Sequence, residues 1–141
     1  MKAGNPQKYE GLIMANSTKE LLFSDPVKFA SYCNGCGSKV GFWTTILWYI
    51  LPDTIWFIDF TDCFDIHDVE YSWPIKFTDR IEALAFKTNT DIRFYQNMLI
   101  RIKQYGGIFE ELRKIRAWGY FKAVSELGQE SFLKEKIFIN A

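Results

Sequence analysis

The sequence predicts an all-α, mostly helical domain. Three observations support this prediction: apolar residues recur every three or four positions between residues 79 and 104, capping residues precede several segments, and prolines or glycine pairs follow them. The chain has 141 residues, of which 48% are hydrophobic and 18% aromatic. That composition favours one domain with a dense core, over residues 1–141, and argues against intrinsic disorder.

The first third of the chain predicts an arm, two short helices and a loop. Residues 1–16 show no periodic apolar pattern, so we expect an irregular arm. Ser17 can cap a helix over 18–23, and Asp25-Pro26 is typical of the start of another over 26–32. Two glycines within three residues then predict a loop over 34–38.

Residues 39–58 form an insert that is rich in aromatic side chains. Helical spacing of its apolar residues begins at Trp43 and ends before Pro52. Trp and Tyr also favour the water–lipid interface, so the insert is either part of the core or a membrane-docking surface or lid.

The second half of the chain predicts longer helices. Thr61 can cap a helix over 62–72 and Thr78 a longer one over 79–104, which Gly106-Gly107 ends. We expect a further helix over 108–127, interrupted near Gly119, and a helix or strand in the tail, 132–139. The apolar stripe expected on the long helix consists of Ile81, Leu84, Ala85, Thr88, Ile92, Tyr95, Leu99 and Ile102.

Charge and cysteine content exclude several classes of protein. Seventeen basic and seventeen acidic residues give a net charge of zero, which argues against a nucleic-acid partner. Neither a secretory signal peptide nor a spanning segment is visible, so we expect a cytoplasmic or virion-associated protein rather than a transmembrane one. Three cysteines are too few for a disulfide framework.

The segment 63–71 carries the residues best suited to chemistry, including the single histidine of the chain, His67. On a helix, Tyr71 shares the face of His67, Cys63 lies one turn earlier, and Asp68 points about 100° round. Histidine can move protons near neutral pH, and a carboxylate can hold a cation. Backbone carbonyls of a glycine-rich loop are good ligands for calcium.

Three segments, in this order, resemble the phospholipase A2 superfamily in its compact viral and bacterial form. His67-Asp68-x-x-Tyr71 resembles the HDxxY signature, whose fuller form is C-C-x-x-H-D-x-C-Y, with Phe64 and Glu70 in place of two half-cystines. Residues 33–37 resemble the calcium loop of that superfamily. Residues 89–94 resemble its A-D-x-x-F segment.

The resemblance implies two long antiparallel helices that carry the site, and a calcium-dependent hydrolysis of the sn-2 ester of phospholipids. His67 would be the general base, Asp91 would orient its imidazole, and Tyr71 would hydrogen-bond Asp91. The implied calcium ligands are the carboxylate of Asp68 and the carbonyls of Cys33, Gly35 and Gly37. The substrate would be a phospholipid membrane surface.

Two other functions remain open from the sequence. The scaffold could serve a non-catalytic structural or interaction protein, for example a virion or tail component within a protein assembly. Alternatively, a Cys₃His zinc site could stabilise the domain, because Cys33, Cys36, Cys63 and His67 have suitable spacing.

Overall fold

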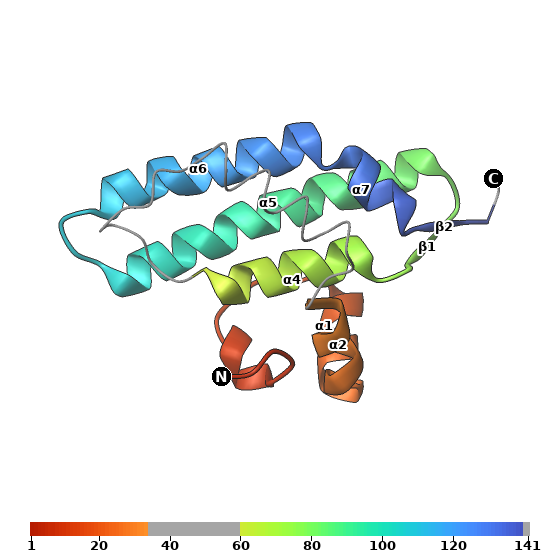
Figure 1. Cartoon of the computed structure of the whole chain (residues 1–141), viewed down its shortest axis with the longest axis horizontal. Coiled ribbons are helices and arrows are strands. Elements are labelled where there is room, and N and C mark those ends of the chain that lie inside the picture. The colour runs from red at the N-terminus through yellow and green to blue at the C-terminus, as the bar shows by residue number, and fades with distance from the viewer. Residues whose placement is uncertain (34–59, 140–141) are drawn as a thin grey trace.

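A computed structural model describes residues 1–33 and 60–139. Three helices form its main body: α4 (Thr61–Ser72), α5 (Arg80–Tyr105) and α6 (Glu110–Leu127). They lie side by side, each antiparallel to its neighbour in the chain, with α5 between the other two (Figure 1). The mostly helical character expected from the sequence is confirmed for the described residues.

Shorter elements complete the fold. A 3₁₀ turn, η1 (Pro6–Tyr9), leads to α1 (Asn16–Ser24) and α2 (Pro26–Cys33), which pack against α4 on the side away from α6 (Figure 1). At the other end, α7 (Gln129–Lys134) packs against α5 and α6. The strands β1 (Lys76–Phe77) and β2 (Ile137–Phe138) pair in parallel, so the tail holds both a helix and a strand.

Helix caps agree with the sequence in one case and differ in three. Asp25 caps α2 as expected, since its Oδ1 accepts from the backbone N–H of Lys28 at 3.1 Å. The prediction of Thr78 as the cap of α5 is wrong by one residue, because Asp79 accepts from the backbone of Glu82. Thr61 and Ser17 lie inside their helices, not at the caps.

The predicted apolar stripe of α5 is wrong in its rotational phase. Ile81 is 80% exposed, and only Ile102 of the predicted set is buried. The buried face carries polar residues that find partners inside the fold, and consists of Ala83, Lys87, Thr90, Asp91, Phe94, Asn97, Met98 and Ile102. Apolar periodicity misplaces this face because hydrogen bonds and ion pairs stabilise charged and polar groups there.

The end signals of the long helices are mostly confirmed. Gly106 takes a φ of +68° directly after α5, a conformation that favours glycine. Helix α6 passes through Gly119 without the expected interruption. The predicted loop over 34–38 and the aromatic insert over 39–58 lie outside the described residues.

No helix of the described residues is long and apolar enough to cross a membrane.

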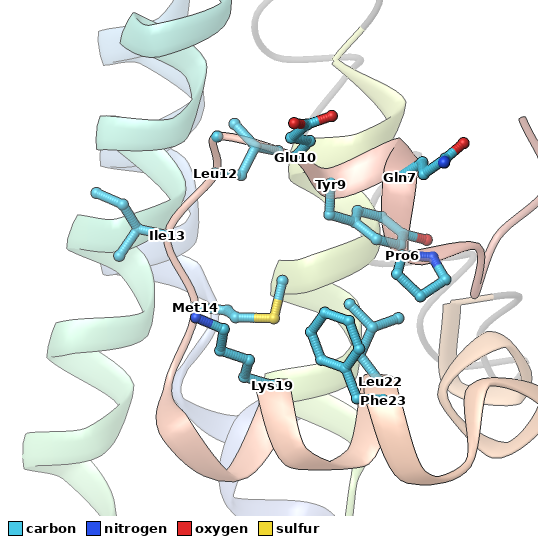
Figure 2. Close-up of a pocket in the computed structure, with 11 residues that line it drawn as sticks. Pro6, Gln7, Tyr9, Glu10, Leu12, Ile13, Met14, Lys19, Leu22 and Phe23 are labelled. Atoms are coloured by element: carbon cyan, nitrogen blue, oxygen red, sulfur yellow. The ribbon is translucent and has the colours of Figure 1, made fainter.

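A surface pocket lies between η1, the segment that follows it and α1 (Figure 2). All its lining residues belong to the first 23 of the chain, so it is separate from the predicted site residues on α4 and α5: Pro6, Gln7, Tyr9, Glu10, Gly11, Leu12, Ile13, Met14, Lys19, Leu22 and Phe23.

Candidate active site

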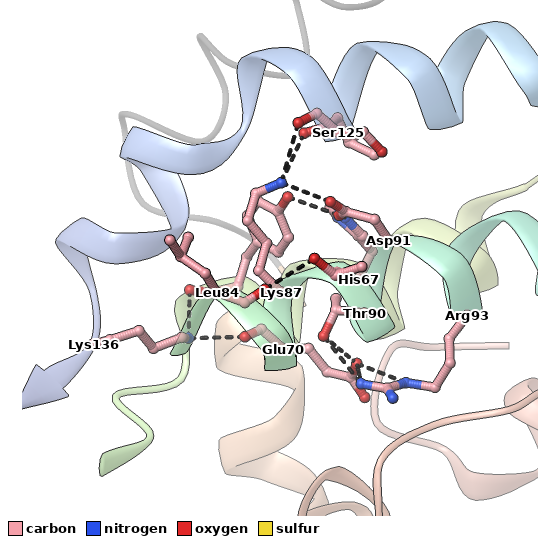
Figure 3. A network of polar contacts seen from close by, with 12 residues as sticks. His67, Glu70, Leu84, Lys87, Thr90, Asp91, Arg93, Ser125 and Lys136 are labelled. Carbon is pink, nitrogen blue, oxygen red and sulfur yellow. Dashed lines mark hydrogen bonds and ion pairs between the residues drawn. The ribbon is translucent and has the colours of Figure 1, made fainter. Parts of the chain in front are cut away.

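His67 and Asp91 meet in the interface between α4 and α5. The Nε2 atom of His67 lies 2.9 Å from Oδ1 of Asp91, and the two residues are only 1% and 2% exposed (Figure 3). Asp79, at the start of the same helix, is its N-terminal cap. The contact between His67 and Asp91 that the resemblance implies is therefore present in the fold.

Tyr71 contacts the same carboxylate from one helical turn further along α4. Its hydroxyl donates to Oδ1 of Asp91 at 2.8 Å. Its ring also lies against the imidazole, with ring centroids 4.1 Å apart, while the centroid of Phe94 lies 4.6 Å from the imidazole. Together, these contacts fix the plane and the position of the histidine side chain.

Lys87 is a member of this cluster that the sequence analysis missed. Its Nζ donates to Oδ2 of Asp91 at 2.7 Å, and lies 3.3 and 3.4 Å from the carbonyls of Val124 and Ser125 (Figure 3). The only sequence signal for it is the four-residue spacing between Lys87 and Asp91 on one helix, which places them on one face.

Electrostatics keep Asp91 ionised and Tyr71 protonated. Burial works to raise the pKa of Asp91, but hydrogen bonds and charge from His67 and Lys87 outweigh it and leave the pKa below its usual value of 3.8. Burial, with the charge of Asp91 second, holds the pKa of Tyr71 well above its usual value. The carboxylate is therefore an acceptor, so Nε2 of His67 and the tyrosine hydroxyl both donate to it.

Gly128, directly after α6, makes room for the tyrosine hydroxyl. A Cβ atom at this position would lie 2.6 Å from the hydroxyl oxygen of Tyr71 and 2.5 Å from the carbonyl oxygen of Val124. Both distances are too short for real contacts. The absence of a side chain here lets Tyr71 reach Asp91.

The calcium ligands implied by the resemblance are only partly described. Asp68 is buried on α4 next to His67, and Cys33 ends α2, with its Sγ 3.8 Å from the carbonyl of Asp65 on α4. A carboxylate and a carbonyl at a helix end are oxygen donors of the kind that calcium prefers. Gly35 and Gly37 lie outside the described residues, and no group of three acidic, histidine or cysteine side chains within 1–33 and 60–139 is arranged to hold a metal.

The two described cysteines lie in different apolar clusters. Cys63 is buried among Phe60, Met98 and Tyr120, and burial followed by the charge of Asp62 raises its pKa. Cys33 packs against the cluster between α1, α2 and α4. The structure thus does not bring these two predicted zinc ligands together, and Cys36 lies outside the described residues.

A second polar network joins α1, α4 and α5 through Glu70, and the sequence analysis missed its role. One carboxylate oxygen accepts from the backbone N–H of Ala15 at 2.9 Å and from Thr18 at 2.8 Å. The other accepts from Thr90 at 3.0 Å and from Arg93 at 2.7 Å (Figure 3). Glu70 occupies a position that is a half-cystine in the signature that this segment resembles. In this chain it links α4 to α1 and α5 through hydrogen bonds and an ion pair.

Comparisons of the chain with protein-family models, with curated proteins and with solved structures find no match.

Proposed function

We propose that this protein is a calcium-dependent, phospholipase A2-like hydrolase that cleaves the sn-2 ester of phospholipids. The observation that carries the proposal is the buried contact of His67 with Asp91, with Tyr71 on the same carboxylate oxygen. Because an ionised Asp91 keeps the proton on Nε2, Nδ1 is the imidazole nitrogen that can accept a proton from water.

In the proposed reaction, Nδ1 of His67 takes a proton from a water molecule as the water oxygen attacks the ester carbonyl carbon. Asp91 stabilises the imidazolium that forms, and Lys87 and Tyr71 hold Asp91 in place. The ester C–O bond then breaks, and the imidazolium returns its proton to the departing alkoxide oxygen. The products are a lysophospholipid and a fatty acid.

Asp68 and the carbonyl of Cys33, with those of Gly35 and Gly37, are the residues proposed to hold the calcium ion. A bound calcium ion would supply positive charge beside the ester carbonyl. The support from the described residues is the oxygen chemistry of Asp68 and of the helix end at Cys33, and the position of Asp68 directly after the proposed base.

A non-catalytic interaction protein is the second candidate function, and one observation favours it. Several apolar side chains on α6 and shortly before it are exposed: Ile108, Leu112, Ile115 and Trp118. Groups of exposed apolar side chains are typical of surfaces that meet a partner.

Fatty-acid release from vesicles separates the two candidates. Vesicles of mixed phosphatidylcholine and phosphatidylglycerol are incubated with the protein in calcium, in chelator, and as the variant His67→Gln. Thr88 is an exposed residue of α5, and the variant Thr88→Ala serves as the control for a substitution away from the proposed site. We expect release that needs both calcium and His67 and that is unchanged in the control. Absence of release from folded protein in calcium would refute the hydrolase and favour the interaction protein.

A further inference from the structure

The ammonium group of Lys87 is enclosed by protein and held by three acceptors. The residue is 6% exposed, and its Nζ contacts Oδ2 of Asp91 and the carbonyls of Val124 and Ser125. Removing a charge from water is costly unless partners compensate for it. The two carbonyls belong to the last turns of α6, where the helix dipole also favours a cation.

The two oxygens of Asp91 have different tasks. Oδ1 accepts from His67 and Tyr71, both on α4, whereas Oδ2 accepts from Lys87. The ammonium is itself fixed by α6, so the carboxylate is held between two helices and cannot rotate about its side-chain bonds without losing contacts. Lys87 therefore reaches the histidine through the orientation of Asp91.

We propose that Lys87 is a positioning residue: by holding Oδ2 of Asp91, it directs Oδ1 to Nε2 of His67 and so fixes the imidazole tautomer that the reaction requires. Its part in the reaction rests on the proposed function, whereas its effect on the tautomer does not. Without the ammonium, the buried carboxylate loses both its orientation and the charge that favours its ionised form.

Lys136 provides a matched control in the same fold. It is equally buried, at 7% exposed, and its Nζ donates to the carbonyls of Glu70, Tyr71 and Trp73 at 2.7–2.8 Å. These acceptors lie at the end of α4, the helix that carries His67. Its removal tests the effect of losing a buried lysine at the end of that helix while the carboxylate and its ammonium stay in place.

The test uses the fact that His67 is the only histidine in the chain. Its two ring nitrogens are observed by ¹⁵N NMR in protein labelled at histidine, at a pH where the shifts no longer change and the ring is neutral. The wild type, Lys87→Met and Lys136→Met are compared, with Asp91→Asn as the reference for a lost carboxylate. We expect the Nε2–H tautomer to dominate in the wild type and in Lys136→Met, and to lose population in Lys87→Met and in Asp91→Asn.

Unchanged tautomer populations in folded Lys87→Met would overturn the proposal. If that variant does not fold, Lys87→Gln gives the same test, because its amide keeps a donor for the carbonyls of α6 but carries no charge. In the vesicle assay we expect Lys87→Met to lower kcat at least about tenfold with little change in KM, and Lys136→Met to change neither. A tautomer change in Lys87→Met, together with no fatty-acid release from the wild type, would refute the proposed hydrolase alone. Fatty-acid release from the wild type, together with unchanged tautomer populations and kcat in Lys87→Met, would refute the role of Lys87 alone.

Discussion

Two buried carboxylates on neighbouring helices, Glu70 and Asp91, make similar contacts, but their partners differ in the chemistry that they can perform. Each is at most 2% exposed, and each contacts a cation at 2.7 Å, Arg93 in one case and Lys87 in the other. The other donors to Glu70 are two threonine hydroxyls and one backbone N–H. Asp91 instead holds an imidazole, the one group among these donors that exchanges a proton near neutral pH.

The comparison teaches that burial and ion pairing do not by themselves mark a catalytic carboxylate. Glu70 joins three helices, and none of its partners within residues 1–33 and 60–139 exchanges a proton near neutral pH, so its contacts fit a structural role. Asp91 joins α4, α5 and α6 as well, but through a histidine and a lysine. The two sites therefore differ in whether the carboxylate contacts a group that gains or loses a proton near neutral pH. Mutation of each carboxylate tests this difference.

The largest expected effect comes from neutralising each carboxylate in turn. Asp91→Asn leaves the buried ammonium of Lys87, and Glu70→Gln the partly buried guanidinium of Arg93, with a weakened partner. Because each carboxylate is itself buried, each variant should lose about 3 kcal/mol of the free energy of unfolding. Only Asp91→Asn should also lower fatty-acid release, by about 10²–10⁴-fold, because it removes the group that orients the proposed base. Urea denaturation measures the loss of stability. The vesicle assay measures fatty-acid release under conditions in which both variants are folded.

Glu70→Gln serves as the control for stability in this comparison. Near wild-type turnover in Asp91→Asn would refute the assigned role of Asp91. An equally large loss of activity in folded Glu70→Gln would mean that the two networks are not functionally distinct.

A smaller effect is expected from Gly128→Ala, which acts on Asp91 indirectly, through Tyr71 and through the Val124 carbonyl that holds Lys87. The φ of Gly128 is −89°, so alanine fits the backbone there, but the added Cβ collides with the tyrosine hydroxyl and with the carbonyl of Val124. We expect a loss of about 1–3 kcal/mol in stability and a fall in kcat smaller than that of Asp91→Asn.

Gly106→Ala is its control. The φ and ψ of Gly106 are +68° and −159°, and an added Cβ there meets no atom within 4 Å, so alanine costs about 1–3 kcal/mol through backbone strain alone. Its turnover should match the wild type. Equal kcat values in the two alanine variants would show that the hydroxyl of Tyr71 does not contribute to the site.

Helical spacing predicted that His67 and Tyr71 share a face of one helix, whereas their contact with Asp91 was an expectation from the resemblance. Gly106, directly after α5, marks the end of that helix, but spacing within one helix does not predict which residue of a neighbouring helix it meets. The same reasoning could not predict Lys87 or Glu70 as buried residues. Burial of a charged group depends on partners from distant segments, such as the end of α6 for Lys87 and α1 for Glu70, and a local pattern does not contain them.

The apolar stripe of α5 failed for the same reason. Its buried face holds Lys87, Asp91 and Asn97, each with a partner in the interior, while Ile81 faces solvent. Periodicity of apolar residues gave the helix but not its rotation, because the interior of this domain is polar where the networks of Glu70 and Asp91 lie. Periodicity and helix end signals therefore predicted the class of fold, and tertiary contacts decide which face is buried.

The smallest expected effect is a pH dependence of stability that belongs to Asp91. Because the pKa of Asp91 is lower in the folded protein than its usual value of 3.8, its ionised form stabilises the fold above that pH. This stabilisation is lost as the pH falls through the folded-state pKa. The difference in free energy of unfolding between the wild type and Asp91→Asn should thus be steady just above pH 4 and shrink below it. Urea titrations of both proteins at a series of acidic pH values measure this difference, and a difference that stays constant down to the acid transition would contradict an ionised Asp91 held by Lys87 and His67.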